Sequence, residues 1–141
     1  CGGGGLIAGT STYLKYAYSN LFSYSVEPED FDDTKKSLEK GKIISNFPGK
    51  RSICDALLAS QPGKLTFAIN QSTLNGGLIV SEEEVKKTII TLAENLKIIT
   101  EPGGAVAAAA VLHKKINVQN KKVVVMISGG NIDSEMFASL K

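Results

Sequence analysis

The chain has 141 residues, of which 43% are hydrophobic and 21% are charged. This length and this balance predict one ordinary globular domain. The formal net charge of +2 is too small to indicate binding to nucleic acid or to a membrane surface. The longest apolar stretch, residues 105–112, is too short to span a bilayer. We therefore expect neither a nucleic acid nor a membrane as a partner.

The two cysteines, Cys1 and Cys54, are too few for a disulfide framework or a cysteine metal cluster. Such sparse cysteine usage suits a reducing compartment. We therefore expect the protein in the cytoplasm.

The first forty residues predict a helix, a strand and a second helix. Apolar residues recur at helical spacing over residues 6–18, and the apolar run over 21–26 predicts a strand. Asp30 is a suitable N-cap for a helix over 31–40, which Gly41 would end.

The middle of the chain predicts a long loop followed by two short elements. Two Pro-Gly pairs make residues 42–63 mostly loop. Residues 64–75 are a candidate helix that two glycines interrupt, and residues 78–80 predict a short strand.

The last sixty residues predict two helices and a buried strand. Residues 81–84, Ser-Glu-Glu-Glu, are a capping box. The helix that follows has an apolar stripe at Val85, Ile89, Leu92 and Leu96. Residues 105–112 are apolar on every side, which predicts a buried helix, and residues 123–127 have the continuous apolar run of an interior parallel strand. The alternation of helices and short strands indicates an α/β fold with an open, mostly parallel, twisted sheet flanked by helices.

The glycine run that precedes the first helix is a candidate anion site. Gly2, Gly3, Gly4 and Gly5 have no Cβ to shield their N–H groups, and Leu6 opens an apolar helical segment. Free N–H groups and the helix dipole both favour a phosphate at such a place. The run also fits the dinucleotide fingerprint from Gly3 to Ala8, with Glu27 near the position of a ribose-binding acid.

Two further segments place polar groups beside glycines. Ser128 and two glycines follow the predicted strand 123–127, at the end where ligands of open α/β sheets bind. Glu101 and Pro102 precede the buried helix, where a helix start explains both residue types. For each segment, a plain turn or cap is the alternative to a ligand site.

An acidic segment, residues 27–33, follows the first predicted strand. Its carboxylates are hard oxygen ligands of the kind that Mg²⁺ or Ca²⁺ prefers. The alternative, which spacing alone favours, is that Asp30 and Asp33 cap the helix that follows.

Six stretches, in this order, resemble the pyridoxal-phosphate (PLP) enzymes of fold type II. The resemblance covers nearly the whole chain and is closest to the short, catabolic-type threonine/serine dehydratases and to serine racemase. The stretches are CGGGGLIAG (1–9), VEPEDFDDT (26–34), RSICDALL (51–58), PGKLTF (62–67), EPGGAVAAAAVL (101–112) and VVVMISGGNID (123–133). The resemblance implies a tryptophan-synthase-β-like fold.

The resemblance also implies site residues. Gly2, Gly3, Gly4 and Gly5, with the amide of Leu6, would hold the cofactor phosphate. Ser128 would hydrogen-bond the pyridine nitrogen, and Glu101 would line the cofactor pocket. Glu27, the carbonyl of Phe31 and Asp33 match the divalent-cation site of serine racemase-like relatives, which would take Mg²⁺ or another divalent cation.

The reaction that the resemblance implies is dehydration and deamination of L-threonine, and of L-serine, to a 2-oxo acid and ammonia. A serine beside the ring nitrogen favours a protonated ring less than an aspartate would, so the ring is a weaker electron sink. Loss of a β-hydroxyl then competes well with transamination. The open alternatives are a serine or hydroxyaspartate racemase or dehydratase of the same family, and a dinucleotide-binding Rossmann domain.

The family's cofactor-bearing lysine belongs to a Ser-x-Lys segment well before the glycine loop, and no lysine of these 141 residues has that position. We therefore expect residues 1–141 to be the C-terminal part of the catalytic domain, inactive alone, with no C-terminal regulatory domain. The resemblance implies a small amino acid as substrate and a homo-oligomer for the full-length protein.

Overall fold

A computed structural model describes residues 1–140 of the chain. Two short strands, β1 (Tyr24–Pro28) and β2 (Gly76–Val80), pair in parallel, with Tyr24 opposite Gly76 and Pro28 opposite Val80. The other elements are α1 (Gly5–Ala17), α2 (Asp33–Lys40), the 3₁₀ turn η1 (Asp55–Leu57), α3 (Lys64–Thr73), α4 (Glu82–Leu96), α5 (Pro102–Leu112) and α6 (Ser134–Ser139).

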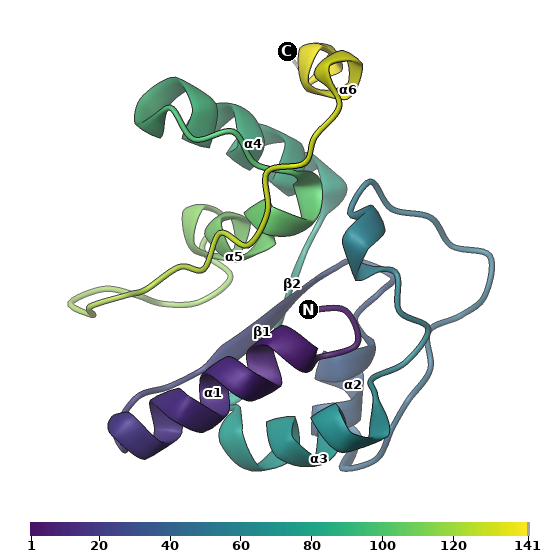
Figure 1. The fold of residues 1–141 in the computed structure, drawn as a ribbon, viewed down its shortest axis with the longest axis vertical. Helices are drawn as coiled ribbons and strands as arrows, with labels where there is room; N and C mark the ends of the chain where they lie inside the picture. The colour runs from purple at the N-terminus through teal and green to yellow at the C-terminus, as the bar shows by residue number, and fades with distance from the viewer. Residues whose placement is uncertain (141) are drawn as a thin grey trace.

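The two strands separate two groups of helices (Figure 1). Helices α1, α2 and α3 lie on one side of the strands, with α1 packed against α3. Helices α4 and α5 pack together on the other side, and α5 contacts both strands. The predicted α/β class is therefore confirmed, as a small parallel sheet flanked by helices.

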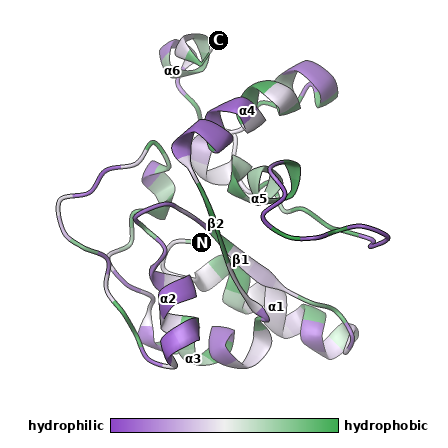
Figure 2. Cartoon of the chain, turned by 180° about the vertical axis from the view of Figure 1, so that it is seen from behind, coloured by the Kyte–Doolittle hydropathy of each residue, from purple (hydrophilic) through white to green (hydrophobic). Residues whose placement is uncertain are grey.

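The main hydrophobic core lies between the strands and the α4–α5 pair. Figure 2 shows α5 largely in the colours of apolar residues and α2 largely in those of polar ones. Alanines on every side let α5 approach its neighbours closely, and the predicted burial of this helix is confirmed. The buried core residues are Val26, Cys54, Val80, Val85, Ile89, Ala105, Val106, Ala109 and Ala110.

The capping box at the start of α4 is confirmed. The N–H of Glu84 donates to Ser81 Oγ at 3.3 Å, and the N–H of Ser81 donates to Glu84 Oε2 at 2.8 Å. Three residues of the predicted stripe are buried, but Leu96 is 61% exposed. Leu96 is the last residue of α4, where the apolar spacing continues after the packing contacts have ended.

In the first half of the chain, two element boundaries differ from the sequence prediction and one agrees with it. The first strand is residues 24–28 rather than 21–26. The N-cap of α2 is Asp32 rather than Asp30, because Asp30 adopts a left-handed conformation (φ 69°) in the turn before it. The predicted stop is confirmed, since Gly41 ends α2 with a left-handed φ of 66°.

The prediction of an interior strand at residues 123–127 is wrong for the described chain. This segment has no regular secondary structure and pairs with no strand within residues 1–140, and Val124 is 89% exposed. The apolar run has the composition of a buried strand, but burial needs a neighbouring strand. The short helix α6 that follows was not predicted from the sequence. Across residues 1–140, none of the helices combines the length and the apolar character that crossing a membrane would require.

Candidate functional site

The glycine loop ends at the N-terminus of α1, as predicted. Gly4 is the N-cap of α1 and has a left-handed φ of 88°, which glycine adopts without strain. No side chain caps this helix end, and Leu6, in its first turn, is 64% exposed. The first N–H groups of a helix have no partner within the helix. The loop therefore offers uncapped donors at the positive end of a helix dipole, which suits a phosphate.

Helix α3 supports this loop from behind. The N–H of Gly63, the N-cap of α3, donates to the carbonyl of Gly3 at 3.2 Å. The hydroxyl of Thr66 donates to the same carbonyl. A Cβ at Gly4 would lie only 2.9 Å from Asn70 Nδ2, so this position accepts no larger residue without movement. The loop is therefore fixed by contacts to a second helix.

The segment that contains Ser128 lies against the start of α5. The N–H of Glu101 donates to the carbonyl of Gly129 at 3.1 Å, and Glu101 Oε2 accepts from the N–H of Asn131 at 3.0 Å. A Cβ at Gly104 would lie 2.5 Å from the Gly129 carbonyl oxygen. Glu101 is the N-cap residue of α5, but its side chain makes no cap hydrogen bond. The Glu101 carboxylate therefore fixes the turn next to Ser128 rather than capping α5. Ser128 itself is exposed.

The turn η1 contacts both glycine-containing regions. A Cβ at Gly2 would lie 3.3 Å from the carbonyl oxygen of Ala56, and one at Gly103 would lie 3.3 Å from Leu57 Cγ. The start of the glycine loop and the start of α5 therefore share one neighbour.

The acidic segment holds the start of α2 by a route that the sequence did not predict. Glu27, fully buried in β1, accepts from the N–H groups of Thr34 and Lys35, both at 2.8 Å. Burial raises the pKa of Glu27 to about 7, although these two hydrogen bonds oppose the shift. A strand residue therefore satisfies the first turn of α2, and neither Asp30 nor Asp33 does so. Because Glu27 is fully buried, it is not placed to bind a ribose.

The structure brings Asp33 close to Glu27. Burial raises the pKa of Asp33 to about 6, while its hydrogen bond from Asn46 opposes the shift. Asp33 Oδ2 is buried and has no hydrogen-bond partner. Phe31 is buried, and its N–H donates to the Pro28 carbonyl. Within residues 1–140, no three His, Cys, Asp or Glu side chains gather as a metal site would require.

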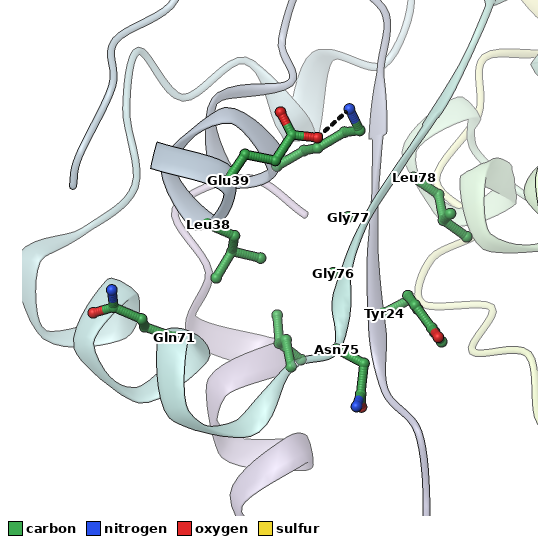
Figure 3. A pocket seen from close by; sticks show the side chains of 10 residues that line it. Tyr24, Leu38, Glu39, Gln71, Asn75, Gly76, Gly77 and Leu78 are labelled. Carbon is green, nitrogen blue, oxygen red and sulfur yellow. Dashed lines mark hydrogen bonds and ion pairs between the residues drawn. The ribbon is translucent and has the colours of Figure 1, made fainter. Parts of the chain in front are cut away.

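An open pocket of about 440 Å³ lies elsewhere, beside β2 and between α2 and α3 (Figure 3). The Lys35–Glu39 ion pair, at 2.7 Å, borders it. None of the site residues predicted from the sequence lines this pocket.

With this geometry in place, comparison with known proteins identifies the family. A model described as "Pyridoxal-phosphate dependent enzyme" matches residues 1–129, and the chain belongs to that family. It is 40% identical to serine racemase of Dictyostelium discoideum, over 94% of this chain and 41% of that protein. It is 38% identical to L-threonine ammonia-lyase of Thermotoga maritima, over 96% of this chain and 33% of that protein.

The solved structures agree with the sequence comparison. The crystal structure of a threonine deaminase from T.th. has 36% sequence identity and a TM-score of 0.87, over 94% of this chain and 47% of that one. The fold is therefore that of the type II PLP enzymes, and the family implies pyridoxal phosphate rather than a dinucleotide. The chain spans less than half the length of these three relatives.

Two residues next to the loop, Thr66 and Asn70, were missed from the sequence. They lie four residues apart on α3, so they share one face of that helix. Polar residues at this spacing usually mark a solvated face. Only the packing of α3 against α1 makes them neighbours of the glycine loop.

Proposed function

We propose that this chain forms part of a PLP-dependent enzyme that dehydrates and deaminates L-threonine, and L-serine, to a 2-oxo acid and ammonia. The observation that carries the proposal is the glycine loop, whose uncapped helix N-terminus is fixed by α3 in a chain of the PLP family. Relatives named for threonine and serine chemistry support this choice of substrate.

In this proposal, the phosphate of PLP binds at Gly2–Gly5 and the amide of Leu6. These residues supply backbone donors and no charged side chain, so the helix dipole contributes to the charge balance. The loop needs little rearrangement to bind, because Gly3 is fixed by Gly63 and Thr66. When bound, PLP supplies an electron sink for breaking a bond at the substrate Cα.

Ser128 hydrogen-bonds the pyridine nitrogen in this proposal. A neutral hydroxyl favours protonation of the pyridine nitrogen less than a carboxylate would. The ring is then a weaker electron sink, which favours expulsion of the β-hydroxyl. Glu101 orients this region through its hydrogen bond to Asn131, close to Ser128. The arrangement suits substrates with a leaving group on Cβ.

Racemisation of serine, and dehydration or racemisation of hydroxyaspartate, are the alternatives within the same family. Each begins by loss of a proton from Cα, and the chemistry diverges afterwards. The similarity to serine racemase of Dictyostelium discoideum favours the racemase as the second candidate.

A divalent cation, Mg²⁺ or a similar ion, is part of the proposal. Glu27, the carbonyl of Phe31 and Asp33 would be its ligands. The buried Asp33 Oδ2 has no hydrogen-bond partner, which supports this proposal, because a bound cation would provide that oxygen with a partner. Glu27 would have to share its oxygens with two backbone N–H groups.

We also propose that a longer chain contributes the lysine that carries PLP, and that the full-length protein is a cytoplasmic homo-oligomer. The share of the relatives that this chain covers supports the first part.

The test begins with the protein as its source makes it. Borohydride reduction fixes PLP on its lysine, so the intact mass should exceed 14.9 kDa and include one cofactor adduct. The same preparation should form a 2-oxo acid from L-threonine and L-serine. Formation of D-serine without a 2-oxo acid would favour the racemase instead.

A matched pair of variants tests the role of Ser128. Ser128→Ala should lower kcat and shift the cofactor absorption spectrum, whereas Ser60→Ala, in an exposed loop, should change neither. An unchanged spectrum in Ser128→Ala would contradict a contact with the pyridine nitrogen.

A further inference from the structure

Helix α3 presents a row of three polar side chains to α1. Thr66, Asn70 and Thr73 lie four and three residues apart, which places them on one face of the helix. Thr66 donates to the carbonyl of Gly3 at one end of the row. Thr73 shares a 2.7 Å hydrogen bond with the hydroxyl of Ser11 at the other. Asn70 lies between two partnered side chains.

Asn70 is fully buried, and neither Nδ2 nor Oδ1 has a hydrogen-bond partner. An unpaired buried amide destabilises a fold, and an apolar side chain of the same shape would remove that cost. The packing of the α1–α3 contact therefore gives no reason for an asparagine here.

The position of Asn70 supplies a reason. Its Nδ2 lies 2.9 Å from the point that a Cβ at Gly4 would occupy. Gly4 is the N-cap of α1 and belongs to the loop that ends in uncapped N–H groups. The unpartnered and buried amide thus lies next to the loop that forms the anion site.

We propose that Asn70 is a positioning residue of this anion site. When a phosphate occupies the loop, the Asn70 carboxamide gains hydrogen bonds to the loop backbone around Gly4, and α3 thereby orders the loop for binding. This inference rests on the anion site in the proposed function, but not on the choice of substrate.

Electrostatics favours this arrangement. The atom of Asn70 nearest to the Cβ position of Gly4 is the donor nitrogen, the positive end of the carboxamide dipole. An anion on the other side of the loop attracts that end, and burial strengthens the attraction because the effective dielectric constant is low. Neither Nδ2 nor Oδ1 of this amide has a hydrogen-bond partner within the protein, so an anion at the loop would couple its own binding to the α1–α3 contact.

The experiment is a titration of the isotope-labelled full chain with inorganic phosphate, followed by ¹H–¹⁵N NMR. In the wild type, the amide signals of Gly3 to Leu6 and the side-chain NH₂ signal of Asn70 should shift together. Asn70→Leu should weaken phosphate binding about tenfold, the order expected for one hydrogen bond within a charged site. Its thermal midpoint should stay level or rise, because the unpaired amide is gone.

Two more variants complete the design. Asn70→Asp keeps the shape but adds a carboxylate, so phosphate binding should fall further at pH 7 and partly recover at acidic pH. Thr73→Val removes a polar group from the same face, away from the loop, and should lower stability while leaving phosphate affinity unchanged.

Three results would overturn the inference. One is unchanged phosphate affinity in Asn70→Leu, which would make Asn70 a packing residue. The second is an Asn70 side-chain signal that phosphate does not move. The third is a wild-type chain whose glycine amides ignore phosphate. A full-length enzyme that binds phosphate through these residues but fails to turn over threonine would contradict only the substrate part of the proposed function.

Discussion

The two glycine-containing segments of the site differ in how the rest of the molecule fixes them. The loop at residues 2–5 starts a long helix and is supported by α3 through the hydrogen bonds of Gly63 and Thr66, with Asn70 beside Gly4. The segment at residues 128–131 has no regular structure and is fixed by Glu101 and the first turn of α5. Both segments place glycine backbone, without side chains, at the site. Contacts from one face of α3 fix the first segment, whereas the Glu101 carboxylate largely fixes the second, so substitutions and pH changes should affect the two differently.

The largest effect should come from pH, and it should act on the loop side of the molecule. Cys1 precedes the glycine loop, and its Sγ lies 3.6 Å from the hydroxyl oxygen of Thr34. The backbone N–H of Thr34 in turn donates to Glu27. The pKa of Glu27 is raised from 4.5 to about 7, so the folded state binds the proton more tightly. The stabilisation from this proton is complete below pH 4.5 and is lost as pH rises to 7.

Denaturant unfolding between about pH 4.5 and pH 7.5 checks this prediction. The titration of Glu27 should lower the free energy of unfolding by up to roughly 3 kcal/mol across that range. Glu27→Gln should reduce the dependence to the part that the raised pKa of Asp33 contributes, whereas Glu29→Gln, at an exposed position, should leave it intact. Equal slopes in the two variants would show that Glu27 does not titrate as described.

A side chain at Gly104 should break the second segment away from α5. The Cβ of Gly104→Val would lie 2.5 Å from the Gly129 carbonyl oxygen, so residues 128–131 would have to move away from the buried start of α5. We expect a loss of about 2–3 kcal/mol in unfolding free energy. Gly9→Ala is the control, because no neighbour lies within 4 Å and a helix gains from alanine. A stable Gly104→Val with protected amides at 129–131 would contradict the close contact.

A side chain at Gly4 should disturb the first segment. Gly4→Ala combines a φ of 88° with a 2.9 Å approach to Asn70, and we expect a cost of about 2 kcal/mol. Gly5→Ala, with open space around its Cβ, should be close to neutral in stability. Thermal unfolding compares the pair, and equal midpoints would show that the loop tolerates a Cβ at position 4.

The smallest effect should come from the carboxylate that fixes residues 128–131. Glu101→Ala removes the acceptor of the Asn131 N–H and should cost about 1 kcal/mol. Hydrogen exchange at Asn131 should accelerate, while exchange in α1 stays the same. Glu94→Ala, on the exposed side of α4, is the control. Unchanged exchange at Asn131 would mean that another contact fixes the segment.

Local patterns in the sequence predicted much of the fold. The capping box at Ser81, the stop at Gly41 and the buried alanine helix α5 were all expected, because each depends on neighbours within one or two turns. The resemblance in six stretches also identified the family correctly. The individual site assignments, from Gly2 to Ser128, stay predictions that the experiments above address.

Three features needed more than local pattern. Residues 123–127 have the composition of a buried strand, yet a strand forms only where another strand lies beside it. Glu27 belongs to an acidic cluster in sequence, but its carboxylate satisfies the start of α2 because β1 and α2 pack together. No local pattern in the sequence marks Asn70 as a neighbour of the glycine loop.

The sequence by itself determined the class of the fold, the family and the glycine loop, because these depend on residue types at fixed spacings. The tertiary structure alone decided which side chains support that loop and what the buried carboxylates do. Hydrogen bonds such as those of Thr66 and Glu27 join segments 7 to 63 residues apart. Their geometry depends on how the helices pack, and spacing along the chain does not encode it.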